Sequence, residues 1–109
     1  MAEVGADVLV AHMGLRTKGT IGARTALTLD QAAERVQAIR DGGAAANPEV
    51  LVICHGGPIA EPEDARFVLE RTRGVHGFFG ASSIERLAVE RAITEQTRAF
   101  KQIIQRRQR

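Results

Sequence analysis

Two histidines, His12 and His55, each follow a short apolar run and each precede glycine within two residues. Imidazole titrates near neutral pH, so a histidine at a strand end can act as a general acid or base. Glycines let the backbone approach a ligand closely, which makes Gly56 and Gly57 candidate contacts. The pattern favours proton transfer by His55, helped by His12. The alternative is structural, with His55 bonded to a turn and His12 packed under the next loop.

A third cluster follows residues 75–79 and consists of Gly80, Ala81, Ser82 and Ser83. It precedes a helical pattern, and helix N-termini attract anions because their N–H groups lack intrahelical partners. We therefore expect a phosphate or carboxylate to bind there. The alternative is an ordinary N-cap followed by a helix, with no ligand.

Residues 14–27 form a long loop that contains several glycines and cations. Loops of this length in compact domains are usually functional or mobile, and glycine-containing loops make good lids. Arg16 and Lys18 are the candidates to offset substrate charge, and Lys18, between Thr17 and Gly19, is the preferred one. The alternative is a solvated loop.

Other reactive side chains favour structural interpretations. Asp64 and Glu85 suit the first turns of helices, and His76 lies inside a strand rather than at its end. Cys54 ends an apolar strand, where a buried inert thiol is expected. No run has zinc or magnesium ligand spacing, so no cofactor is predicted, and any divalent metal would be held chiefly by strands outside this chain.

Three βα units position these clusters. Apolar runs at 7–11, 49–54 and 75–79 predict strands, and a helical pattern follows each run. Thr28 and Gln31 match a capping box, Gly42 and Gly43 weaken the end of that first helix, and Gly74 closes the second one.

The last helix is predicted to run to about residue 105, capped by Ser82 or Ser83. Its inner face is marked by Ile93, Thr97, Phe100 and Ile104. The fold class is therefore α/β, with three parallel strands and three helices. Because parallel strands point the same way, the three clusters should meet at one edge of the sheet.

Residues 1–5 resemble the last turn of a helix whose body is missing. A sheet of three parallel strands also leaves both edges open, a situation that natural folds avoid. We therefore expect residues 1–109 to form one partial domain, either the C-terminal portion of a larger barrel or a protomer completed by another copy. A homo-oligomer is the expected assembly.

Composition restricts the class of protein. Of 109 residues, 44% are hydrophobic and 26% charged, as in ordinary globular domains, and no apolar run is long enough for a membrane helix. A single cysteine and no signal-peptide pattern favour a cytoplasmic setting. The net charge is only +2, and no aromatic residue lies among the last four cations near the C-terminus, which argues against a nucleic-acid partner.

Three segments together resemble the phosphoenolpyruvate hydrolase-like TIM-barrel family. They are Ala6-Asp7-Val8-Leu9-Val10-Ala11-His12-Met13-Gly14, Cys54-His55-Gly56-Gly57-Pro58 and the stretch from His76-Gly77-Phe78-Phe79 to Ile84-Glu85-Arg86-Leu87. The resemblance implies the last three units of a (β/α)₈ barrel and an activity on small phosphorylated or phosphono-carboxylic acids. The chain departs from the family pattern at Ala88, where a proline is expected.

A second function is open on the same resemblance. A plant antiviral protein that binds viral replication proteins is similar to this family in its C-terminal domain. The alternative to an enzyme is therefore a non-catalytic protein-interaction module, because one fold serves many functions.

Overall fold

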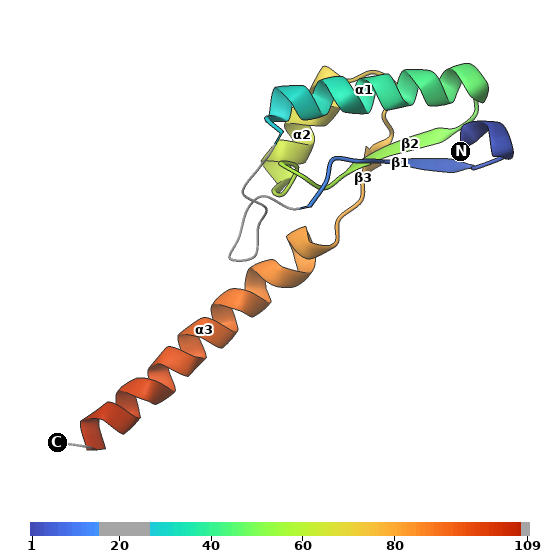
Figure 1. The fold of residues 1–109 in the computed structure, drawn as a ribbon. Coiled ribbons are helices and arrows are strands. Elements are labelled where there is room, and N and C mark those ends of the chain that lie inside the picture. The colour runs from blue at the N-terminus through green and yellow to red at the C-terminus, as the bar shows by residue number, and fades with distance from the viewer. Residues whose placement is uncertain (16–26, 108–109) are drawn as a thin grey trace.

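The computed structural model describes residues 1–15 and 27–107. The elements follow the order η1 (Ala2–Val4), β1 (Val8–His12), α1 (Leu29–Ala46), β2 (Leu51–His55), α2 (Pro62–Arg71), β3 (Gly77–Phe78) and α3 (Ser82–Arg107). The three strands form one parallel sheet in the order β1-β2-β3 (Figure 1). The predicted α/β class is confirmed, and the open sheet is consistent with part of a barrel.

β1 and β2 begin and end slightly later than their apolar runs predict, whereas β3 is shorter than its run at both ends. β1 and β2 pair in parallel with Val8 opposite Leu51 and His12 opposite His55, so the two histidines are the last residues of neighbouring strands. β3 is only two residues long, with Gly77 opposite Ile53. The expected convergence of strand ends is thus set by register.

α1 begins with the predicted capping box: Thr28 Oγ1 accepts from the Gln31 N–H, and Gln31 Oε1 accepts from the Thr28 N–H. Gly42 and Gly43, which were expected to weaken the end of this helix, lie inside it, since α1 continues to Ala46. Gly43 is buried against Leu9, and a Cβ there would overlap the Leu9 side chain. Close packing on β1 therefore offsets the low helix propensity of glycine.

α2 begins at Pro62, with Glu61 at its N-cap. Asp64 is buried and its carboxylate accepts hydrogen bonds from the N–H groups of Ala60 and Glu61, which confirms its predicted place at a helix N-terminus. The helix ends at Arg71 rather than at Gly74, because Thr72 is already extended. Gly74 instead supplies a left-handed turn, with φ +72°, on the way to β3.

Gln37 fixes the turn between α2 and β3 to the side of α1. Its amide nitrogen donates to the Arg73 carbonyl (3.2 Å), and its amide oxygen accepts from the Arg73 N–H (2.7 Å). This pair of bonds holds the turn that leads into β3, and so positions the third strand end.

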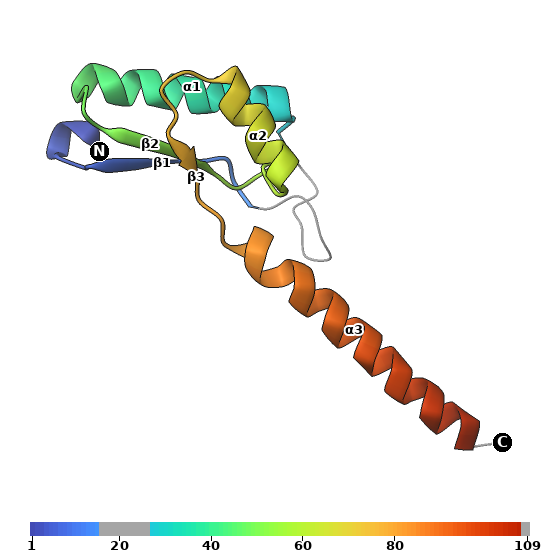
Figure 2. The ribbon, with the colours of Figure 1, turned by 180° about the vertical axis from the view of Figure 1, so that it is seen from behind.

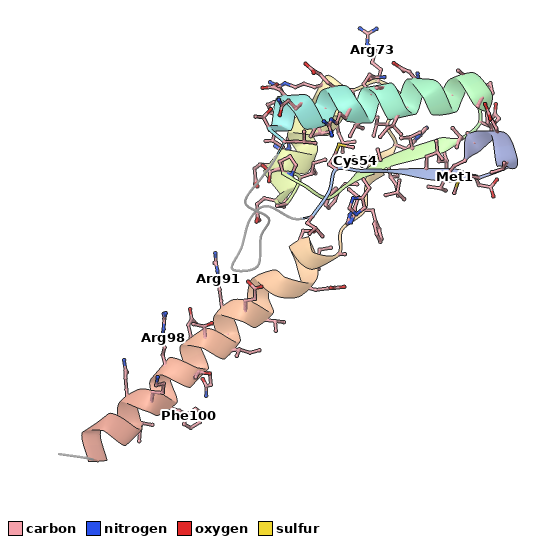
Figure 3. All side chains as sticks on the ribbon, viewed as in Figure 1. Met1, Cys54, Arg73, Arg91, Arg98 and Phe100 are labelled. Atoms are coloured by element: carbon pink, nitrogen blue, oxygen red, sulfur yellow. The ribbon has the colours of Figure 1, made fainter. Side chains whose placement is uncertain are left out.

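One face of the sheet is covered by α1 and α2. Ala11, Val52 and Cys54 are almost completely buried on this face. The helices contribute mainly small and β-branched residues, which bring them close to the strands: Ala32, Ala33, Val36, Ala65 and Val68. Figure 3 shows Cys54 beneath α1 in this core.

The opposite face is open. Val8, Val10 and Leu51 alternate with the core residues along β1 and β2, and each remains 45–47% exposed. Figures 1 and 2 show both helices that follow β1 and β2 on the other side of the sheet. Within the part of the chain described, this face has no covering layer.

α3 extends away from the sheet, so that the molecule measures 70 × 26 × 21 Å (Figure 2). The prediction of an inner face was wrong for the described residues, because Ile93 and Phe100 are more than half exposed. Phe100 lies far from the core in Figure 3, and the side chain of Ile104 lies outside the described residues. No described helix combines the length and hydropathy that crossing a membrane requires.

Candidate functional site

A cavity of about 220 Å³ lies at the carboxyl end of the sheet. The residues that line it come from all three strand ends and from the start of α3: His12, Gly14, Leu15, His55, Gly56, Ile59, Phe78, Ala81, Ser83 and Glu85. The clusters predicted from sequence to meet at one edge therefore share one cavity. Ligands in parallel α/β folds bind at this edge.

His12 and His55 are in direct contact at the carboxyl ends of β1 and β2. Their ring centroids lie 4.8 Å apart, with the planes at 74° in an edge-to-face arrangement. Because they continue the alternation of Val8, Val10 and Leu51, both rings belong to the open face of the sheet. The pairing expected across neighbouring strands is present.

Each ring is oriented by a backbone group through Nδ1. The Gly14 N–H donates to His12 Nδ1 at 3.0 Å. His55 Nδ1 lies 2.6 Å from the Phe79 carbonyl oxygen, which can only accept, so this nitrogen donates. The Phe79 ring also contacts His55, with centroids 4.9 Å apart. The third strand end therefore orients the histidine of the second.

Glycines join the turns that follow β1 and β2. Gly57 donates its N–H to the Gly14 carbonyl, and the Met13 N–H donates to the His55 carbonyl. Gly56 and Gly57 have positive φ of 79° and 61°, and a Cβ at either would collide with the carbonyl of Gly14 or Met13. Only glycine allows this approach. Gly56 lines the cavity, whereas Gly57 is buried behind it.

The N-terminus of α3 forms another wall. The Ala81 carbonyl accepts from the N–H groups of Ile84 and Glu85, so α3 begins directly after Ala81. The N-cap position that was predicted for Ser82 or Ser83 is therefore taken by Ala81, because α3 begins at Ser82. Ser83 lines the cavity, and its Oγ is buried without a hydrogen-bond partner among the described residues. A buried hydroxyl without a partner is unusual and suits a polar ligand.

Glu85 adds a negative charge to the same wall. Its exposed side chain complements the helix dipole, as its sequence position predicted, yet it also faces the cavity. The carboxylate opposes the binding of an anion close to it. The N–H groups of the first turn of α3 act in the opposite direction.

Several predicted contacts are not in the lining. Gly80 is set back, where a Cβ would crowd Phe78, Ile84 and Ser83, so this glycine serves packing at the start of α3. Arg16 and Lys18 lie outside the described residues, as does the side chain of Ser82.

His76 and Cys54 have structural roles, as expected, but the prediction that His76 lies inside a strand was wrong, because β3 begins at Gly77. His76 Nδ1 accepts a hydrogen bond from the Val52 N–H at 3.0 Å. The side chain thus takes the place of a backbone partner on the β3 side of β2. Cys54 is fully buried, and this burial raises the pKa of its thiol. A buried protonated thiol is a poor nucleophile.

No group of three or more histidine, cysteine or acidic side chains is arranged to hold a metal ion in the described ranges, 1–15 and 27–107. The lining residues that sequence reasoning missed are mainly apolar, namely Leu15, Ile59 and Phe78. Phe79 was also missed, because a backbone carbonyl that orients a side chain leaves no signal in residue type.

Comparison with known proteins places the sequence of this chain in a family. Residues 1–103 match the family model described as phosphoenolpyruvate hydrolase-like. The chain is 58% identical over 103 residues to the "ToMV susceptible protein tm-1(GCR26)" of Solanum lycopersicum, and 57% identical to the "ToMV resistance protein Tm-1(GCR237)" of the same plant. It is also 33% identical over 102 residues to the "Putative transcriptional regulatory protein y4pA" of Sinorhizobium fredii.

These matches cover 94% of this chain in each case, but only 14% of either plant protein and 17% of the bacterial one. The chain therefore spans about a seventh of the length of its plant relatives. The names of these relatives refer to ToMV susceptibility, ToMV resistance and transcriptional regulation, and none of them names a reaction.

Proposed function

The chain belongs to the phosphoenolpyruvate hydrolase-like family, and on that premise we propose that its cavity binds a small phosphorylated or phosphono-carboxylic acid and transfers a proton to or from it. The observation that carries this proposal is the contact between His12 and His55 inside a cavity at the carboxyl end of the sheet. Two imidazoles at such a position supply acid–base chemistry near neutral pH.

In this proposal the parts have separate tasks. His55 moves the proton, and His12 assists it. The first turn of α3 holds the phosphate or phosphonate group, together with the Ser83 hydroxyl, which has no hydrogen-bond partner among the described residues. Arg16 or Lys18 offsets the remaining negative charge of the ligand. Both residues follow β1 and lie outside the described residues. Gly56 lets the backbone lie against the ligand.

The test is calorimetric binding of phosphoenolpyruvate and of phosphonopyruvate to the full-length protein and to its Ser82→Ala, Ser83→Ala double variant. Loss of the two hydroxyls should weaken binding about tenfold or more, because hydrogen bonds to charged groups contribute roughly 1.5–3 kcal/mol each. Thr94→Ala, on the exposed part of α3, is the control and should bind as the parent does. Unchanged affinity in the double variant would remove the anion site from the proposal.

A second candidate is a protein-interaction module, favoured by the exposed apolar residues of the open sheet face and of α3. Such a module would retain its partner when His55 is replaced, and would turn over none of the acids tested. If His55→Ala alone abolished partner binding while the fold stayed intact, this second candidate would fail.

We also propose a homo-oligomer, because a second copy could pair with the open edges of the three-stranded sheet. Size-exclusion chromatography with light scattering tests this directly. A discrete dimer or larger assembly supports it, and a stable monomer at micromolar concentration contradicts it.

A further inference from the structure

The two histidines of the cavity differ in what Nδ1 does. A backbone N–H can only donate, so His12 Nδ1, which receives the Gly14 N–H, carries a lone pair. A carbonyl oxygen can only accept, so His55 Nδ1, which faces the Phe79 oxygen, carries a proton. In a neutral imidazole the proton is on one nitrogen alone. The backbone therefore fixes opposite tautomers in two rings that touch.

The consequence appears at the other nitrogen of each ring. Neutral His12 holds its proton on Nε2 and offers a donor, whereas neutral His55 has a bare Nε2 and offers an acceptor. The ring centroids are 4.8 Å apart and both rings line the cavity, so one small molecule can reach both. We infer that His55 is the proton acceptor of the pair, that His12 is the hydrogen-bond donor, and that the cavity prefers a 2-hydroxy acid to the matching 2-oxo acid.

The preference follows from counting hydrogen bonds. A 2-hydroxy acid donates its hydroxyl proton to His55 Nε2 and accepts from His12 Nε2–H with an oxygen. A 2-oxo acid has only acceptors at these positions, so it satisfies His12 and leaves His55 Nε2 without a donor. The 2-hydroxy acid therefore makes one hydrogen bond more with the protein than the 2-oxo acid does, and this bond favours its binding. This substrate class rests on the proposed function, whereas the tautomers do not.

The tautomers are measured without any ligand. Long-range ¹H–¹⁵N correlation spectra of protein labelled at histidine, taken at about pH 8.5, where imidazoles are generally neutral, distinguish protonated from bare ring nitrogens. The chain has three histidines, so each signal is assigned by replacing one residue at a time. His76 is an internal reference, because its Nδ1 accepts from the Val52 N–H and it must share the tautomer of His12.

The expected spectrum shows His12 and His76 protonated at Nε2, and His55 protonated at Nδ1. If His12 and His55 have the same tautomer, the assignment of roles is overturned. This result is independent of whether any acid binds, so failure of the proposed function and failure of the tautomer assignment are distinguishable.

Binding then tests the preference. Phosphonolactate and phosphonopyruvate share a skeleton and differ only in a hydroxyl or a carbonyl at C2. The extra hydrogen bond should make phosphonolactate bind about threefold to tenfold more tightly. Asparagine variants keep the backbone bond near Nδ1 and remove Nε2. His55→Asn should abolish the preference, and His12→Asn should weaken both acids equally.

Two results overturn the inferred preference. One is equal binding of the two acids by the parent protein, and the other is a preference that survives in His55→Asn. If neither acid binds, the substrate class fails together with the proposed function, while the spectrum still decides the tautomers.

Discussion

The two faces of this small sheet are built from the same apolar residue types and differ in what covers them. Val52 is buried under α1 and α2, whereas Val10, on the neighbouring strand but on the opposite face, is 45% exposed. The covered face ends in the inert thiol of Cys54, and the open face ends in the contact between His12 and His55. Stability and chemistry are thus assigned to alternate residues of the same strands.

This difference indicates where the free energy of folding comes from. On the covered face, apolar area leaves water as strand residues such as Ala11, Val52 and Cys54 pack in one core with residues of α1 and α2, which stabilises the fold. On the open face, apolar groups remain in water and contribute little. A side chain on that face is free to serve a ligand or a second layer of protein, and replacing it costs the fold little.

The largest expected effect is on stability. Val52→Ala should lower the free energy of unfolding by about 2–3 kcal/mol, because it removes buried carbon atoms and leaves a cavity. Val10→Ala removes the same atoms from the open face and should cost under about 1 kcal/mol. Urea denaturation of both variants measures the contrast. Equal costs would mean that the open face is covered in solution.

Cys54, on the covered face, makes the free energy of unfolding depend on pH. Burial raises the pKa of its thiol, so the folded state retains a proton that the unfolded chain loses above about pH 8.5. The unfolded state then binds fewer protons than the folded state, and stability must fall as the pH rises through that range.

Urea denaturation at several alkaline pH values checks this decline, with Cys54→Ala as the control that lacks it. The histidines at the end of the open face belong to the cavity rather than to the core, so their removal should leave the alkaline decline in place. A decline of the same size in Cys54→Ala would show that another group is responsible.

A smaller effect is expected at the wall of the cavity. Glu85→Gln removes a negative charge that faces the site, so binding of phosphoenolpyruvate should strengthen about twofold to fivefold, as for an exposed charge pair. Glu95→Gln, on an exposed part of α3, should change nothing. Weaker binding in Glu85→Gln would mean that this carboxylate contacts a proton donor of the ligand.

The sequence predicted correctly those features that depend on residue type and on residues nearby in the chain. Thr28 and Gln31 form their capping box, Asp64 lies in the first turn of α2, and His12 meets His55 because parallel strand ends align. Tertiary contacts decided the rest. Gly43 stays helical because Leu9 packs against it, a contact that helix propensity does not reveal.

The site was predictable in its location and less so in its details. Strand-end histidines and glycines indicated the edge, but the Phe79 carbonyl that orients His55 is a backbone group and has no sequence signature. The helical spacing of Ile93 and Phe100 indicated an apolar stripe on α3. That spacing does not specify which surface the stripe contacts, and on this chain both residues are exposed.

We expect a small acid to bind at the carboxyl end of the open face, and not against the covered face. A titration with phosphonopyruvate, followed through backbone ¹H–¹⁵N signals, tests it most directly. We predict saturable shifts at His12, Gly14, His55, Gly56 and Ser83, and none at the solvent-facing positions of α1. Shifts confined to α1, or no saturable shift at all, would contradict the claim.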